Sequence, residues 1–294
     1  MNQEKKLVYV GAHPDDESFG MGATLAKYVA AGVKVYYICA TRGEAGTVAS
    51  EFLRDYSSIA ELRCAEMKAA AGVLGLAGVY YLDFRDSGMS GSAENRHPEA
   101  LTNAPLSRVT ERLVKLFRQI QPDVVVTHDP GGGYGHPDHV ATHNAVVQAF
   151  SASADPVQFP AAGPPFQPRK LYFGVRTHRL MRLAVRLMPL LGQNPHKFGR
   201  NHDIDFSAMV MQPDYPVNAI LKVSQKDLAQ RLRSAACHAS QGGGQPPMRG
   251  IGLIGAVNTI FMYKNRWLGT RETFMRAYPP PDSRQVESDL FQGL

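Results

Sequence analysis

The sequence predicts an α/β fold: a doubly wound, mostly parallel, Rossmann-like sheet with helices on both faces and a C-terminal elaboration. Short apolar runs alternate with longer helical segments through the first half of the chain. Such alternation is typical of a parallel sheet covered on both faces. With 294 residues, 44% of them hydrophobic and 20% charged, the chain is long enough for a large core and is neither disordered nor fibrous.

The predicted strands and helices follow one another in sequence order. The first strand is the apolar run LVYVGA, and the helix before the fourth strand must stop before Pro122. We expect strands at residues 7–12, 33–41, 79–84, 123–127 and 171–175, and helices at residues 18–31, 51–74, 106–120 and 139–150. A strand order of 3-2-1-4-5 would place the switch point between the first and the fourth strand.

The alternation weakens after Ser151. Residues 156–168 are rich in Pro, Ala and Gly and are expected to form a loop, whereas a helix is expected from Ser224 to about residue 238. A Gly- and Pro-containing loop at residues 242–247 and a short α/β tail follow. We interpret residues 1–294 as a single domain, with residues 156–202 as an insertion or lid segment within it.

The positive charge of the chain is local. The whole chain has 32 basic and 26 acidic residues, a net charge of +6. Residues 156–202 contain no Asp or Glu and eight basic residues, and the remainder has 24 basic against 26 acidic residues, a net of −2. The average charge therefore does not indicate a nucleic-acid-binding protein, and the basic segment needs its own explanation.

The three cysteines argue against a disulfide framework and a thiolate metal site. Cys39, Cys64 and Cys237 lie far apart and form no CxxC pair. The first six residues are polar and lead directly into an apolar run, without the pattern of a signal peptide. The longest weakly polar stretch, residues 250–263, is too short to span a bilayer. We therefore expect a cytoplasmic protein.

Two similar clusters of His, Pro and Asp follow the first and the fourth predicted strands. They are AHPDDES at residues 12–18 and HDPGGGYGHPDH at residues 128–139. Doubly wound sheets bind ligands outside the carboxyl ends of their strands, at the switch point. The two loops should therefore face each other across one site.

The residue types in these loops favour a metal site. His13 and Asp16 lie three positions apart at a strand-to-helix turn, and His139 comes from the facing loop. Two histidines and a carboxylate leave a coordination position for water, as in catalytic zinc sites. A bound divalent ion lowers the pKa of its water to about 7, which supplies a nucleophile at neutral pH.

Neighbouring residues fit the other roles of a hydrolytic site. Asp15 should point away from the metal, as suits a general base that takes the proton of the water. His136 and Tyr134 are candidates for stabilising an oxyanion, with Asp138 holding the His136 ring in the useful tautomer. We interpret His128 as an ordinary strand-end residue. Three further residues have plain helical interpretations, namely His143, Glu17 and Ser18.

The motifs AHPDDE and GGYGHPDH together resemble the LmbE-like family of zinc-dependent N-deacetylases. That family includes the PIG-L type N-acetylglucosaminyl-phosphatidylinositol deacetylases and the mycothiol-pathway deacetylase and conjugate amidase. The resemblance extends from Val8 to the segment HASQ at residues 238–241, which is similar to the family's HxSQ element. It is strongest to the mycothiol-type branch, because of GGYGHPDH and of RDSGM at residues 85–89. Residues 156–202 match no family motif, which leaves the substrate open.

The resemblance implies roles for individual residues. It implies zinc ligation by His13, Asp16 and His139. It implies proton transfer and oxyanion stabilisation by Asp15, His136, Asp138 and Tyr134. It implies substrate contacts by Glu44, Arg63, Asp86 and Met89. Arg63 and Glu66 also fit a simple pair on one helix surface, and iron(II) or another divalent metal stays open beside zinc.

Four hypotheses of function follow. The leading one is a metal-dependent hydrolase that removes the acetyl group of an N-acetylglucosamine-type substrate, with Asp15 as general base. An amidase that cleaves a larger thiol-sugar conjugate shares this chemistry. Two histidines and a carboxylate also form the facial triad of non-heme iron oxygenases, but the strand-helix alternation argues against their all-β barrels. A binding module with a vestigial metal site would be favoured by a missing catalytic residue, and none of the expected set is missing.

The expected partner is a small amino-sugar substrate. Nucleic acid is not expected, because no recognition motif accompanies the basic residues. Within residues 177–191, one helical stripe carries Arg179, Arg182 and Arg186. This stripe fits a lid or packing helix with a solvated basic face. Contact of residues 176–191 with anionic lipid, a rim for a phosphorylated substrate, and a homo-oligomer remain open.

Overall fold

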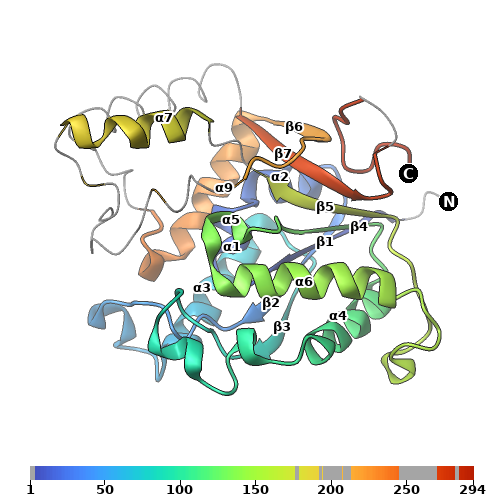
Figure 1. Ribbon diagram of the computed structural model, residues 1–294, viewed down its shortest axis with the longest axis horizontal. Coiled ribbons are helices and arrows are strands. Elements are labelled where there is room, and N and C mark those ends of the chain that lie inside the picture. Colours follow the sequence, from blue (N-terminus) through green and yellow to red (C-terminus); the bar gives the residue numbers. More distant parts are fainter. Residues whose placement is uncertain are drawn as a thin grey trace.

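A seven-stranded sheet forms the centre of the computed structural model, in the order β3-β2-β1-β4-β5-β7-β6 (Figure 1). The structure describes residues 4–175, 179–191, 194, 207, 213–244, 270–281 and 285–294. The strands are β1 (Lys6–Gly11), β2 (Lys34–Thr41), β3 (Gly78–Phe84), β4 (Val124–His128), β5 (Lys170–Val175), β6 (Ala219–Val223) and β7 (Thr270–Tyr278).

The first five strands are parallel and have the predicted order 3-2-1-4-5. β1 lies in the middle, with Leu7 opposite Val35 of β2 on one side and Val124 of β4 on the other. All three side chains are fully buried, as expected for strands covered on both faces. The predicted fold class is confirmed.

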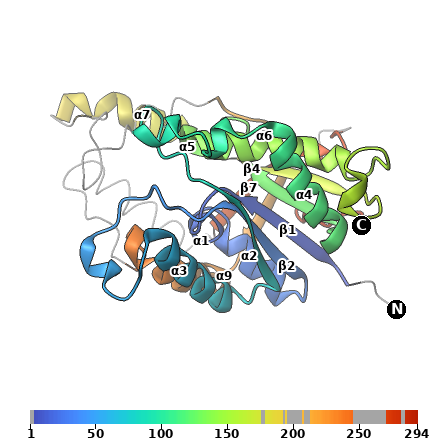
Figure 2. The same cartoon turned by 90° about the horizontal axis from the view of Figure 1, so that it is seen from below.

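Helices cover both faces of the sheet (Figure 2). Successive strand residues point to opposite faces, so Val8 and Val10 lie in one core cluster and Leu7 and Tyr9 in the other. The first cluster is closed by α4 and α6, and the second by α2 and α3, against which α9 packs. These helices are α2 (Gly22–Ala30), α3 (Ile59–Leu74), α4 (Leu106–Ile120), α6 (Pro137–Ala152) and α9 (Gln225–Cys237).

Two predicted helices are divided in the structure. The helix expected at residues 18–31 is a short α1 (Asp16–Phe19) and α2, because the chain bends at Gly20 and Met21. The helix expected at residues 51–74 is a 3₁₀ helix, η1 (Ser50–Leu53), followed by α3. Ser58 starts α3 by accepting the N–H of Glu61 at 3.1 Å.

The C-terminal half extends the same sheet with antiparallel strands. β7 pairs with β5, where Phe173 lies opposite Met275, and β6 pairs with β7. A buried ion pair of 2.7 Å between Lys170 Nζ and Glu287 Oε1 joins β5 to the C-terminal segment. The helix expected from Ser224 is α9, which starts with a capping box.

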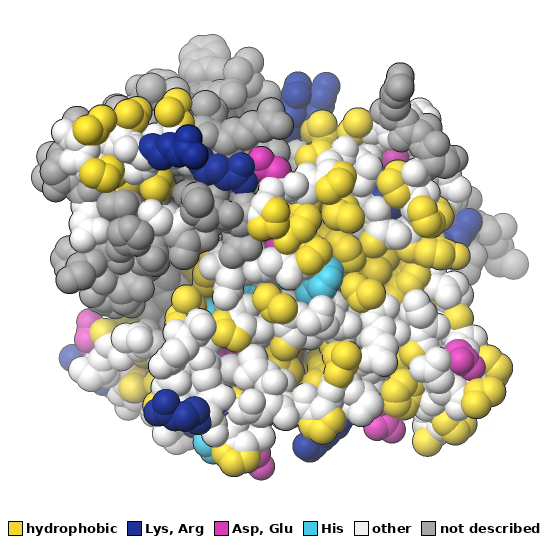
Figure 3. All heavy atoms as spheres, in the orientation of Figure 1, with side chains coloured by type: hydrophobic (Ala, Val, Ile, Leu, Met, Phe, Trp, Pro, Cys, Tyr) yellow, Lys and Arg dark blue, Asp and Glu magenta, His cyan; other side chains and the backbone are white. Residues whose placement is uncertain are grey.

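The acid-free segment at residues 156–202 is partly described. It contributes the 3₁₀ helix η4 (Pro160–Ala162), β5, α7 (Arg179–Leu187) and the 3₁₀ helix η5 (Pro189–Leu191), and residues 176–178, 192–193 and 195–202 lie outside the described residues. Leu183 and Arg186 are exposed on α7, and Figure 3 shows basic and hydrophobic side chains side by side over this helix. Among the helices within the described ranges, none is both long and apolar enough to cross a membrane.

Candidate active site

The loops that follow β1 and β4 meet at the predicted switch point. The two strands are neighbours in the sheet, so their carboxyl ends lie side by side. The first loop leads into α1, and the second leads through α5 (Gly132–Gly135) into α6. The two clusters found in the sequence therefore form one site.

Imidazole and carboxylate groups gather around Asp16. Its Oδ1 lies 3.4 Å from His139 Nε2, and its Oδ2 lies 3.4 Å from His128 Nε2 and 4.0 Å from His13 Nδ1. In the described part of the chain, the sets whose ligand atoms all lie within 4.8 Å are His13–His136–His139, Asp16–His128–His139 and His13–Asp86–Asp138. The three predicted ligands are thus brought together, but they are divided between the first two sets.

The donors around Asp16 fit a divalent cation. Among the residues that the structure describes, the buried Nε2 atoms of His128 and His139 have no hydrogen-bond partner. His139 Nδ1 lies 3.2 Å from the carbonyl oxygen of Gly132, a contact that leaves the Nε2 lone pair for a metal. Burial raises the pKa of Asp16, but the facing histidines outweigh it and hold the pKa well below its usual range. Two imidazoles and a carboxylate suit zinc and also iron(II).

His128 belongs to this cluster, which differs from its interpretation as an ordinary strand-end residue. Its ring stacks on that of His139, with centroids 3.9 Å apart and planes 10° apart. His143 Nδ1 lies 2.9 Å from the His128 carbonyl oxygen. The signal that could have found His128 is its place as the last residue of β4, directly at the switch point.

Asp15 lies next to the cluster and has contacts of its own. Its φ of 135° is rare for a residue with a side chain. Its N–H donates to Glu17 Oε2 at 3.0 Å, and its Oδ2 accepts from Arg63 Nη2 at 2.9 Å. Burial raises the pKa of Asp15 to about 7, although Arg63 acts in the opposite direction. A carboxylate with such a pKa can accept and return a proton near neutral pH.

Arg63 is placed against Asp15 and two loops, whereas the resemblance implied a substrate contact. Its side chain is only 4% exposed. It also donates to the carbonyl oxygens of Pro14 at 2.7 Å and Gly43 at 2.9 Å. Gly43 has a φ of +70°, and a Cβ there would lie 2.1 Å from Arg63 Nη1. The close approach of this glycine allows Arg63 to hold the Asp15 carboxylate.

His136 is a neutral hydrogen-bond donor in this arrangement. Its Nδ1 accepts the backbone N–H of Asp138 at 3.2 Å, which caps α6. Since that nitrogen accepts, the ring proton lies on Nε2. Burial and the neighbouring His13 lower the pKa of His136 to about 4, so the ring carries no charge at neutral pH.

Tyr134 is the most exposed of the predicted catalytic side chains, at 38%. Its ring centroid lies 5.1 Å from that of His139 and 5.9 Å from that of His136. The turn before it is held by Asp129 Oδ1, which accepts the N–H groups of Gly131 at 2.8 Å and Gly133 at 3.1 Å. Partial burial and the nearby carboxylates of Asp16 and Asp15 raise the pKa of the Tyr134 hydroxyl, which therefore keeps its proton and can donate it in a hydrogen bond.

The Asp138 carboxylate contacts His13, which corrects the expectation that it holds the His136 ring. Its Oδ2 lies 3.2 Å from His13 Nε2 and accepts the N–H of Ser87 at 2.9 Å. Asp86 Oδ1 lies 3.6 Å from the same nitrogen. Burial lowers the pKa of His13, but these carboxylates raise it well above its usual value. Because Asp138 lies in the first turn of α6, only its N–H points back to the capping His136 ring.

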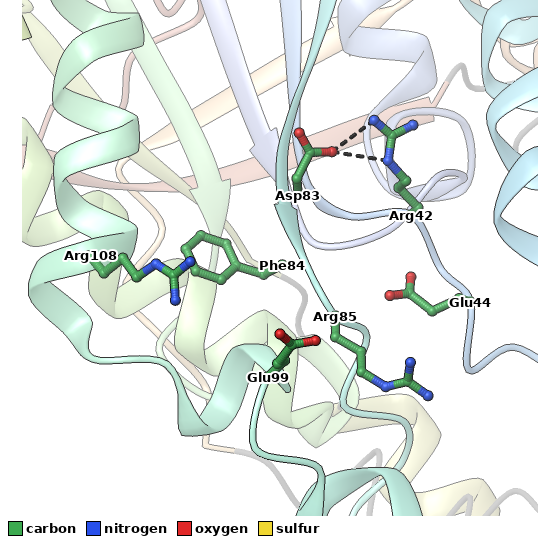
Figure 4. Close-up of a pocket in the computed structure, with 7 residues that line it drawn as sticks. All are labelled: Arg42, Glu44, Asp83, Phe84, Arg85, Glu99 and Arg108. Atoms are coloured by element: carbon green, nitrogen blue, oxygen red, sulfur yellow. Dashed lines mark hydrogen bonds and ion pairs between the residues drawn. The ribbon is translucent and has the colours of Figure 1, made fainter.

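The other implied substrate contacts lie along the loops after β2 and β3. The N–H of Asp86 donates to Glu44 Oε1 at 3.2 Å, and Met89 is 52% exposed. A cavity of about 250 Å³ adjoins Glu44 at the carboxyl ends of β2 and β3 (Figure 4). It is lined by three guanidinium groups, three carboxylates and one aromatic ring, which belong to Arg42, Arg85, Arg108, Glu44, Asp83, Glu99 and Phe84.

Known proteins are similar to this chain in sequence and in fold. Residues 8–150, which contain both clusters, match the family described as PIG-L: GlcNAc-PI de-N-acetylase. A relative from Thermomonospora curvata is 33% identical over 247 residues, 81% of each chain, and is named 1D-myo-inositol 2-acetamido-2-deoxy-alpha-D-glucopyranoside deacetylase. The chain belongs to the PIG-L family.

Two further similarities of this PIG-L protein cover more of the chain than residues 8–150. A relative from Catenulispora acidiphila, named as a second deacetylase of the same type, is 30% identical over 315 residues, 100% of this chain and 98% of its own. The solved structure of N,N'-diacetylchitobiose deacetylase from Pyrococcus horikoshii has a TM-score of 0.60 at 24% identity and covers 95% of this chain and 88% of its own. The family resemblance predicted from the motifs is confirmed.

Proposed function

We propose that this PIG-L chain is a zinc-dependent deacetylase that removes the acetyl group of an N-acetylglucosamine-type substrate. The observation that carries the proposal is the gathering of histidines around Asp16 next to a partly buried Asp15. Hydrolysis of an amide needs an activated water, a base and donors for the oxyanion. The site has candidates for all three.

His13, Asp16 and His139 would hold the zinc ion, with His128 as an additional nitrogen donor beside them. When bound, zinc lowers the pKa of its water to about 7 and polarises a carbonyl oxygen. Asp16 Oδ2 already accepts two backbone N–H groups of its own loop, at 2.8 and 3.0 Å. This carboxylate is therefore oriented by the protein itself.

Asp15 acts as the general base. Arg63 occupies its Oδ2, so we assign proton transfer from the attacking water to Oδ1. The departing amine needs a proton, and both Asp15 and His136 lie in the site. Because burial keeps His136 neutral with a pKa of about 4, Asp15 is the better carrier of that proton.

His136 and Tyr134 stabilise the tetrahedral intermediate. The Nε2–H of His136 and the hydroxyl of Tyr134 are uncharged donors, and both can donate to the oxyanion that forms at the acetyl carbon. Such donors stabilise the transition state more than the ground state, because the oxygen gains charge only as the water adds. Removal of either donor should therefore lower kcat.

The substrate class follows from the relatives. Two of them are named for an N-acetylglucosamine unit linked to inositol, and we propose a substrate of that class. Glu44, Asp86 and Met89 would contact its hydroxylated part, next to the cavity that is lined by both acidic and basic groups. The names support deacetylation over cleavage of a thiol-sugar conjugate.

The test is acetate release from an N-acetylglucosaminyl inositol and from free N-acetylglucosamine. We expect activity that a chelator abolishes and that zinc restores. Asp15→Ala should lower kcat by about 10²- to 10⁴-fold at unchanged zinc content. Asp55→Ala, which removes an exposed carboxylate between η1 and α3, is the control and should keep full activity. Full activity of Asp15→Ala would contradict the mechanism.

A further inference from the structure

A buried contact between an imidazole and a carboxylate joins the AHPDDE loop to the HASQ segment. His238 Nε2 lies 2.7 Å from Glu17 Oε1, and both side chains are fully buried. Ser18 Oγ lies 2.5 Å from the same carboxylate oxygen and 2.8 Å from Ser234 Oγ. Glu17 therefore does more than place a negative charge at a helix start, as its sequence position suggested.

Glu17 connects this contact to the proposed general base, Asp15. Its second oxygen, Oε2, accepts the N–H of Asp15 at 3.0 Å. Asp15 has the unfavourable φ of 135°, and such a backbone persists only where its surroundings hold it. One oxygen of Glu17 thus faces His238 and Ser18, and the other holds the strained residue.

Further contacts fix α9 and the HASQ segment to the AHPDDE loop and to α3. Arg231 of α9 donates to the carbonyl oxygens of Ser18 at 3.2 Å and Phe19 at 2.7 Å. Ser240, two residues after His238, donates from its N–H and from its hydroxyl to Glu66 of α3, each at 2.7 Å. These contacts place His238 against Glu17 from outside the catalytic loop.

We propose that His238 and Glu17 are positioning residues for the deacetylation, because together they hold the backbone of Asp15 in the conformation that presents its carboxylate. This inference rests on the proposed function, in which Asp15 is the base. Arg63 holds the side chain of Asp15, and Glu17 holds its N–H. The HASQ segment thereby contributes to catalysis without contact with the substrate.

Two substitutions at His238 separate positioning from packing. The amide nitrogen of Gln reaches about as far as Nε2 and can donate to Glu17, whereas that of Asn ends near Nδ1. We expect His238→Asn to lower kcat about 10- to 100-fold, with KM within about twofold and unchanged zinc content, since a small displacement of a reacting group has effects of this size. His238→Gln should recover most of the wild-type kcat.

A double-mutant cycle tests whether both residues act through one contact. Glu17→Gln replaces the carboxylate by an amide, whose single oxygen can accept a hydrogen bond from Asp15 or from His238, but not from both. We therefore expect about a tenfold lower kcat. The double variant, Glu17→Gln with His238→Asn, should have a kcat no lower than that of the less active of the two single variants. Lys226→Ala removes an exposed side chain in the first turn of the same helix α9 and is the control, with kcat within about twofold of wild type.

Hydrogen exchange provides a readout without turnover. In His238→Asn, but not in His238→Gln, amides of residues 12–19 should exchange about tenfold faster. The inference would be overturned if the exchange rates of these amides did not change in His238→Asn, or if Asn and Gln at position 238 lowered kcat equally. It would also be overturned if the kcat losses of the two single variants multiplied in the double variant. Absence of acetate release by the wild-type protein contradicts the proposed function instead, and the exchange experiment still decides the positioning.

Discussion

Three histidines of the site differ in the group that one of their ring nitrogens contacts. His139 faces a backbone carbonyl with Nδ1, His136 accepts a backbone N–H with Nδ1, and His13 faces two carboxylates with Nε2. The first contact presents a lone pair toward Asp16, and the second presents an N–H. These contacts suit the different roles that we propose for residues of the same type, His139 as metal ligand and His136 as donor to the oxyanion.

The placement of His128 leads to a prediction about metal affinity. His128→Ala removes a buried nitrogen 3.4 Å from Asp16 Oδ2, so we expect the Kd for zinc to rise about 10- to 100-fold, as measured by competition with a chromophoric chelator. His143→Ala is the control, because that ring contacts only the backbone of His128 in the cluster. Equal affinities of wild type and His128→Ala would show that His128 plays no part in metal binding.

Helices and strands are predicted most accurately in the parallel half of the sheet, where apolar strands and helices alternate in the sequence. The strands of the parallel half are continuous apolar runs, because both faces are covered, and they were found within a few residues. The divided helices were missed, since Ser58 starts a new helix inside a run of good helix formers. β6 and β7 were missed because no strand-helix alternation marks them, and their antiparallel pairing comes from tertiary contacts.

The contact between Gly43 and Arg63 can be tested at this scale. Gly43→Ala would place a Cβ 2.1 Å from Arg63 Nη1, so we expect displacement of Arg63 and about a tenfold lower kcat. Gly32→Ala is a matched control, because Gly32 has a similar φ of +81° and no atom within 4 Å of the added Cβ. It should cost about 1 kcal/mol of stability and leave kcat unchanged. A similar kcat of the two variants would refute the role of Arg63.

At the scale of the whole molecule, the topology brings the two motifs together. The strand order predicts that residues 12–18 and 128–139 meet, and they do. The orientation of individual side chains was not predictable in this way, since Asp138 turned to His13 and Arg63 to Asp15. Sequence spacing gives the loop that carries a side chain, whereas rotamers depend on packing among all the loops.

The C-terminal segment is fixed to the sheet by Glu287, which predicts a pH-dependent stability. Burial raises the pKa of Glu287, but Lys170 and Tyr172 outweigh it and lower the pKa. A carboxyl group with a lowered pKa stabilises the fold above its unfolded pKa and loses this effect as the pH falls through its folded pKa. Glu287→Gln should therefore lower the free energy of unfolding by about 3 kcal/mol at pH 7 and by less below about pH 4.

Urea denaturation at pH 7 and at a pH below about 4 measures how much Glu287→Gln lowers the free energy of unfolding at each pH. Glu4→Gln is the control, because the Glu4–Lys34 pair is about half exposed and 3.7 Å long and should change stability by less than about 1 kcal/mol. A loss in Glu287→Gln that is equal at the two pH values would contradict the account of this ion pair.

A zinc titration of the metal-free protein, with acetate release from an N-acetylglucosaminyl inositol as the readout, tests the proposed metal-dependent deacetylation most directly. We expect no activity without metal, a linear rise to a plateau at about one zinc per chain, and no such rise in Asp15→Ala loaded with the same amount of zinc. Acetate release by the metal-free protein, or an equal rise in Asp15→Ala, would contradict it.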